Sequence, residues 1–178
     1  EHLKFPSTSI TLRKTTSIPV LDEAGELLPA TAEVLQLVKD ADAILSTGHM
    51  SPPEITAVLR AANKMGLRRL VVNHPNFVIE AAPDQAREWV ELGAVIEHGL
   101  VQYDERTTFF QWKVDTMLRF IDAVGVDNTN IGSDSGQKNN PFPVDSYEKI
   151  LGELLNAGVS PADIRKLVAV NTGRVLDG

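Results

Sequence analysis

Short apolar runs alternate along this chain with longer segments whose apolar residues recur every three or four positions. The short runs end in polar residues and turn signals, which is typical of buried strands, whereas the longer spacing is typical of amphipathic helices. The expected strands lie within Leu3–Ile10 and Ala43–Ser51, and at Leu70–Asn73, Ala94–Ile96 and Thr129–Gly132. Because these runs are apolar throughout, we expect both faces of the sheet to be covered. The pattern therefore predicts an α/β fold with a parallel sheet.

Helix signals punctuate the segments between the strands. Ser51 is the expected N-cap of a helix whose first residue is Pro52, and Gly66 is its expected stop. The expected helices are Pro29–Lys39, Pro52–Met65, Pro83–Leu92, Thr107–Val124 and Ser146–Asn156, followed by one that starts after Ser160 and a last turn at Thr172–Asp177.

The length of the chain limits the architecture. With 178 residues and about five β/α units, it forms one domain in our interpretation, spanning residues 1–178. A closed eight-stranded barrel takes about 250 residues. We therefore expect either an open sheet or the C-terminal portion of a (β/α)8 barrel that lacks its first strands.

Composition excludes several partners. The net charge of −7 argues against nucleic acid or an anionic membrane as a partner. The chain has no cysteine, so it has neither disulfides nor thiolate metal ligands, which is compatible with the cytoplasm. No apolar run approaches the roughly 20 residues that a membrane span needs.

Polar side chains gather at the expected strand ends. His49, His74 and Asp134 each follow one strand, and Glu97 and His98 follow another. In a parallel sheet these ends share one rim, and imidazoles with a carboxylate are the ligands of zinc-type hydrolytic sites. Taken singly, each histidine is more often a hydrogen-bonded structural residue, and Asp134 could be a turn former. However, three of the four histidines fall at such ends, so the set predicts a metal site.

Other residues are weaker candidates for substrate contacts or metal ligands. Gln137, in the loop after Asp134, is a candidate substrate contact, as are Glu97 and His98. Lys4 lies in the first expected strand, where some metal sites use a carbamylated lysine, but a lysine facing solvent is the more frequent case.

The ordered motifs resemble those of the amidohydrolase superfamily of metal-dependent hydrolases, which are distorted (β/α)8 barrels. LKFPSTS, STGHMSPPE, VVNHP, GAVIEHG and IGSDSGQ are similar to the ends of strands 4 to 8 in phosphotriesterase-like members, and VNTGRVLDG to their closing segment. The order resembles one uncharacterised amidohydrolase-like family in particular. The resemblance implies that His49 and His74 are ligands of one or two divalent metal ions, with zinc favoured. It implies that Asp134 is both a ligand and the base that activates water.

One departure from the superfamily matters. Its first strand carries a His-x-His pair that completes the metal site, and this sequence contains none. We expect the missing strands to come from preceding sequence, from a homo-oligomer or from a partner chain. The resemblance implies a hydrolase whose metal-bound hydroxide attacks an amide, ester, lactone or phosphoester in a small molecule. The alternatives are a metal-dependent decarboxylase, a catalytically inactive partial barrel with a structural role, and an open α/β binding domain, for which no glycine-rich phosphate motif is present.

Overall fold

The computed structural model describes residues 18–178, so Lys4 and the strand expected within Leu3–Ile10 lie outside it. Within that range the chain is α/β, as predicted, with four parallel strands. These are β1 (Leu45–Ser46), β2 (Leu70–Asn73), β3 (Ala94–Gly99) and β4 (Thr129–Gly132). They pair in the order β1-β2-β3-β4, so each strand lies beside the one that precedes it in sequence and the strand order does not reverse.

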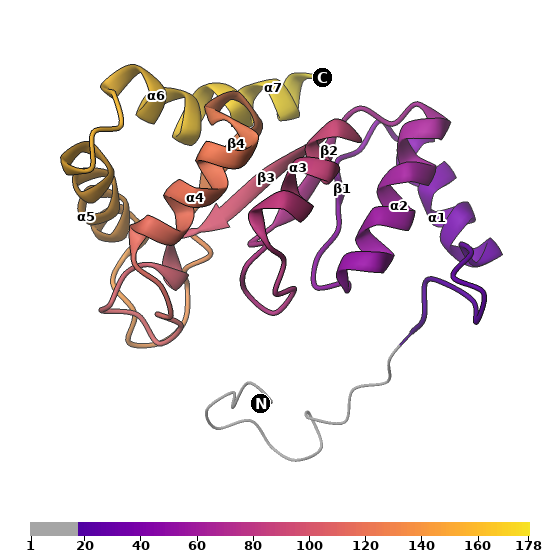
Figure 1. Ribbon diagram of the computed structural model, residues 1–178, viewed down its shortest axis with the longest axis horizontal. Coiled ribbons are helices and arrows are strands. Elements are labelled where there is room, and N and C mark those ends of the chain that lie inside the picture. Colours follow the sequence, from indigo (N-terminus) through magenta and orange to yellow (C-terminus); the bar gives the residue numbers. More distant parts are fainter. Residues whose placement is uncertain (1–17) are drawn as a thin grey trace, which may run out of the picture.

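Helices connect and follow the strands (Figure 1). They are α1 (Pro29–Asp40), α2 (Pro52–Met65), α3 (Pro83–Glu91), α4 (Val114–Val124), α5 (Pro143–Asn156), α6 (Pro161–Arg165) and α7 (Asn171–Asp177), with 3-10 turns η1 (Leu100–Gln102) and η2 (Val126–Asn128) and a π-helical stretch η3 (Lys166–Val170). Ser51 is the N-cap of α2, where its main-chain N–H donates to the Glu54 carboxylate at 2.8 Å. Gly66 ends α2 with φ of 85°. In residues 18–178 no helix is long and apolar enough to cross a membrane.

The prediction of a helix over Thr107–Val124 is wrong at its start, because α4 begins only at Val114. The preceding segment is held as a loop by other bonds. The Thr107 hydroxyl donates to the carbonyls of Val101 and Asp104. The main-chain N–H groups of Gln111 and Trp112 both donate to the Gln102 carbonyl. These tertiary bonds outweigh the helical spacing of the apolar residues.

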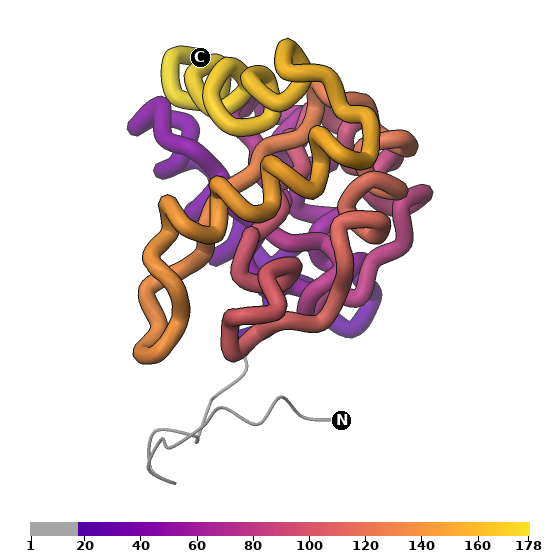
Figure 2. Tube along the Cα trace, turned by 90° about the vertical axis from the view of Figure 1, so that its left-hand side faces the viewer, coloured from indigo at the N-terminus to yellow at the C-terminus, as the bar shows by residue number. Residues whose placement is uncertain are grey.

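The two faces of the sheet differ. On one face Leu70, Val72 and Ile96 pack into the main apolar core with α1 to α4. On the other face Val71 and Val95 pack against Val175 of α7. Helix α7 lies near the amino ends of the strands, and Figures 1 and 2 place it at the opposite end of the molecule from the loops that follow β3 and β4. The carboxyl ends of the strands are therefore left for those loops.

Candidate functional site

Two of the histidines predicted as ligands meet at the carboxyl ends of β1 and β2. The Nε2 atoms of His49 and His74 lie 3.2 Å apart, and their ring centroids are separated by 4.8 Å. His49 reaches this position from the turn between β1 and α2, and His74 directly follows β2. The parallel sheet thus brings together side chains 25 residues apart in sequence.

The backbone at this rim is strained. His74 has a backbone φ of 27° and Asp134 one of 50°, values that residues other than glycine rarely adopt. The His74 main-chain N–H donates to the Glu97 carbonyl at 2.5 Å, and its carbonyl accepts from Phe77 N–H at 3.0 Å. Strained residues of this kind cluster at functional sites, where the surrounding bonds hold them in place.

Asp134 is exposed at the same rim, directly beyond β4. Burial lowers the pKa of His74 and neighbouring His49 lowers it further, while Asp134 is close enough to oppose them by raising it. The net result is a His74 pKa below its ordinary value. Gln137 folds back over this turn, donating from Nε2 to the Asp134 carbonyl at 3.0 Å. Across residues 18–178, however, no group of three or more His, Asp or Glu side chains lies close enough to hold a metal.

The histidine pair fits a divalent metal in its donor chemistry and spacing. Two imidazole nitrogens bound at 2.0–2.1 Å to a tetrahedral zinc lie about 3.3 Å apart, and the observed separation is 3.2 Å. The lowered pKa favours a neutral His74, the state that metal binding requires. His74 Nδ1 is buried without a hydrogen-bond partner among the described residues, whereas metal-bound histidines usually donate from their second nitrogen. The pair accounts for two ligands of such a site.

Glu97 lies within β3, where it pairs with Asn73, the residue of β2 that directly precedes His74. Asn73 donates from Nδ2 to the Glu97 carboxylate at 2.9 Å and accepts from the Ser46 hydroxyl. On the other side of Glu97, a Cβ built on Gly132 of β4 would lie 3.5 Å from its carboxylate carbon. A polar row therefore crosses the face opposite the main helical core.

His98 points to the other side of the sheet and has no exposed surface. Its Nδ1 lies 2.9 Å from the Tyr103 hydroxyl, which donates to Oδ1 of Asn76 at 3.1 Å. Its ring also packs against Phe120, with centroids 5.4 Å apart. Burial, with a smaller contribution from His74, lowers the pKa of His98 to about 3. His98 is therefore neutral in the folded protein and does not reach the rim surface.

This buried histidine predicts acid sensitivity. Between pH 6.5 and about 3 the unfolded state binds a proton at His98 that the folded state does not. The free energy of unfolding therefore falls as the pH drops below 6.5, by up to about 1.4 kcal/mol per pH unit. Urea denaturation at intervals between pH 7.5 and 4 measures this slope. H98N should reduce it by close to the amount that corresponds to one bound proton, about 1.4 kcal/mol per pH unit. An unchanged slope in H98N would contradict the assignment.

The carboxylate of Asp104 titrates in a different pH range from His98. Burial raises the pKa of Asp104, but hydrogen bonds from Arg106 and Ser146 outweigh it and lower the pKa to about 2. Its contribution to stability is present above pH 3.8 and is lost as the pH falls towards 2. The interval from pH 6.5 to 4 therefore separates His98 from Asp104.

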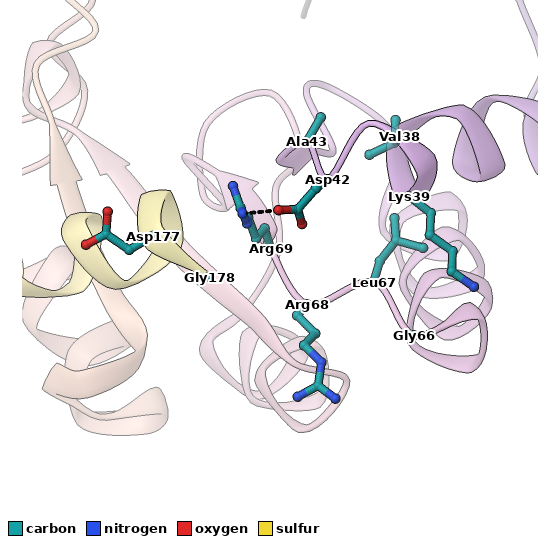
Figure 3. Close-up of a pocket in the computed structure, with 10 residues that line it drawn as sticks. All are labelled: Val38, Lys39, Asp42, Ala43, Gly66, Leu67, Arg68, Arg69, Asp177 and Gly178. Atoms are coloured by element: carbon teal, nitrogen blue, oxygen red, sulfur yellow. Dashed lines mark hydrogen bonds and ion pairs between the residues drawn. The ribbon is translucent and has the colours of Figure 1, made fainter.

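A cavity of about 440 Å³ lies at the amino ends of the strands, opposite the rim that carries His49 and His74 (Figure 3). It is lined by Arg68 and Arg69 directly before β2, by Ala43 two residues before β1, and by Gly178 at the end of the described chain. An ion pair between Arg69 and Asp42 crosses it. It is distinct from the histidine pair, which follows the carboxyl ends of the same strands.

Sequence reasoning missed the buried polar residues beneath the rim. Tyr103, Asn76 and Gln102 are almost fully buried, and neither side-chain polar atom of Gln102 has a hydrogen-bond partner among the described residues. They lie in loops and a short 3-10 turn, without the regular spacing that marks a strand or helix face. The one available signal was their position, since Asn76 and Gln102 each follow a strand within a few residues.

Comparison with known proteins gives one weak relative and one family. Over 171 residues, or 91% of its length, the chain is 22% identical to nesprin-2 of Mus musculus, of which it spans only 2%. The profile of a family of unknown function, DUF6282, matches residues 1–97, which include β1, β2 and most of β3. Because this match covers more than half of the chain, the protein belongs to the DUF6282 family of unknown function.

Proposed function

We propose that this protein is a metal-dependent hydrolase of the amidohydrolase type that acts on a small molecule. The observation that carries the proposal is the pair of imidazole nitrogens 3.2 Å apart at the carboxyl ends of two neighbouring parallel strands. In parallel β/α folds this end of the sheet is where ligands bind and catalytic groups lie. A bound divalent metal, such as zinc, would supply Lewis acidity and lower the pKa of water.

The residues at the rim would divide the work. His49 and His74 would hold the metal, and their spacing suits two positions of a tetrahedral site. Asp134 would be the third ligand and would also take the proton from the attacking water, roles for which its exposed carboxylate beside His74 is suited. Gln137 holds the main chain at Asp134, and Glu97 is available to a substrate from the polar row below. The bond that is cleaved would be an amide, ester, lactone or phosphoester.

The finer architecture is also a proposal. We infer that the four strands form part of a (β/α)8 barrel whose remaining strands come from a longer chain or from a partner chain. The unreversed order β1-β2-β3-β4 supports this, because an open doubly wound sheet changes direction at a switch point. The polar row on the face opposite the main helical core also supports it, since Ser46, Asn73 and Glu97 would face the barrel interior.

Zinc titration of the purified chain tests the proposal. Isothermal calorimetry should give close to one zinc per chain, and H49Q combined with H74Q should abolish binding. H2Q is the control, because His2 is the one histidine of the sequence that does not follow or end an expected strand. The same titration on a chain extended at its amino end should give tighter binding, since the missing ligands would then be present. Absence of zinc binding in both chains would refute the metal-dependent hydrolase.

A second candidate is a catalytically inactive partial barrel with a structural or assembly role. Two observations favour it. No three-ligand group is present within residues 18–178. In addition, side chains bond to carbonyls of the edge strand β4: Asn171 donates to Thr129 at 2.7 Å and Tyr147 to Ile131 at 2.9 Å. These bonds satisfy part of that edge without another strand. A monomeric, stable chain that binds no zinc would support this candidate.

A further inference from the structure

Three residues of the loop after β2 have strained backbone conformations. His74, Val78 and Glu80 all have positive φ values, of 27°, 57° and 57°. Val78 is β-branched, so this conformation is especially unfavourable for it. Residues in such conformations persist only when surrounding structure over-determines them. The loop therefore needs firm attachment to the rest of the fold close to His74.

Tyr103 provides such an attachment. Its hydroxyl links His98 on β3 to Asn76, which lies two residues beyond His74. The donors and acceptors in this series of hydrogen bonds are fixed by chemistry. The Asn76 Oδ1 atom can only accept, so the Tyr103 hydroxyl must donate its proton to it. The Tyr103 oxygen must then accept from His98 Nδ1–H. All three side chains are nine-tenths or more buried, so water cannot readily replace either bond.

The network works alongside one main-chain contact. The His74 N–H donates to the Glu97 carbonyl, next to His98 on β3. Strand β3 therefore holds this loop at two points. Its backbone binds His74 directly, and His98 binds Asn76, two residues beyond His74, through Tyr103. Loss of the Tyr103 hydroxyl would leave Asn76 Oδ1 and His98 Nδ1 buried without these partners. The favourable response is for the loop to open and let water reach them.

We propose that Tyr103 is a positioning residue, which acts through Asn76 to hold His74 at the rim in the geometry that places its Nε2 atom beside that of His49. The hydrogen bonds and backbone angles alone support the positioning of the loop, whereas a role of this geometry in metal binding rests on the proposed function.

The test compares the two tyrosines of the chain. Y103F removes the hydroxyl of the network, whereas Y147F removes the hydroxyl that bonds to Ile131 and serves as the matched control. Hydrogen exchange is followed at the amides of His74 and Phe77, relative to Ile96 in the core of β3. We expect Y103F to accelerate exchange at both loop amides by about tenfold or more relative to Ile96. Y147F should leave this ratio unchanged.

Zinc affinity gives the second readout. Y103F should weaken it by about tenfold, in the range found when partners that orient a ligand are removed, and Y147F should not. An unchanged exchange ratio in Y103F would overturn the inference, as would equal losses of zinc affinity in the two variants. If neither the unmodified chain nor the chain extended at its amino end binds zinc but Y103F still accelerates exchange at His74, the hydrolase proposal fails and the positioning role of Tyr103 stands.

Discussion

Replacing Gly99 by alanine is expected to lower zinc affinity by about 100-fold while the protein still folds. A Cβ at this position would lie 2.9 Å from the Asp134 Cβ and 3.2 Å from its Oδ2. The nearest atom belongs to the root of the Asp134 side chain, so rotation of the carboxylate cannot relieve the clash. Asp134 must move, and its φ of 50° leaves it little freedom to do so. Displacements of about 1 Å at such sites cost about 100-fold in function.

Gly99 itself has an ordinary φ of −88°, so its role is to leave space rather than to adopt an unusual conformation. Overpacking of this kind destabilises a fold by about 1–3 kcal/mol, which thermal unfolding would measure beside the zinc titration. G152A is the matched control. Gly152 lies inside α5 with nothing within 4 Å of an added Cβ, so alanine there should raise stability by up to about 1 kcal/mol. Unaltered zinc affinity in G99A would show that the position of Asp134 is irrelevant to the site.

The sequence predicts the regular elements well because each carries its own local signals. Ser51, Pro52 and Gly66 marked both ends of α2, and the strands Leu70–Asn73 and Thr129–Gly132 have the predicted bounds. The start of α4 was missed because Gln102 and Thr107 bind distant main-chain groups, and such tertiary bonds leave no trace in local spacing. The same reason explains the missed buried network, whose members belong to three separate segments.

For the candidate site, sequence reasoning could name residues but not directions. The parallel rule placed His49 and His74 at one rim, and the structure brings their Nε2 atoms together. Glu97 and His98 were predicted to follow a strand that ends at Ile96, but β3 continues to Gly99 and contains both residues. Neighbouring residues on a strand point to opposite faces, so Glu97 joins the polar row and His98 is buried against Phe120. Without knowing where β3 begins to pair, the sequence cannot assign the two faces.

Truncating Trp89 to alanine should destabilise the fold by about 3–5 kcal/mol, as is usual for removing a buried tryptophan. Trp89 lies on α3 with no exposed surface, in the core that α2 and α3 form with the sheet. Its indole N–H donates to the Thr56 hydroxyl on α2 at 2.9 Å, so W89A removes both packing and the bond between the two helices. Because domains of this kind are typically stable by about 5–15 kcal/mol, a substantial part of the total would be lost. Urea denaturation followed by far-ultraviolet circular dichroism measures the change.

Leu37 provides the control for W89A, because its side chain on α1 is 68% exposed and L37A should change stability by no more than about 0.5 kcal/mol. Equal losses in the two variants would contradict the core assigned here. W89A and G99A also separate stability from function. Trp89 packs in the core on the helix-covered face of the sheet, opposite the polar row, so folded W89A should bind zinc as the unmodified chain does. G99A should instead stay folded and bind zinc weakly, since its defect lies at Asp134.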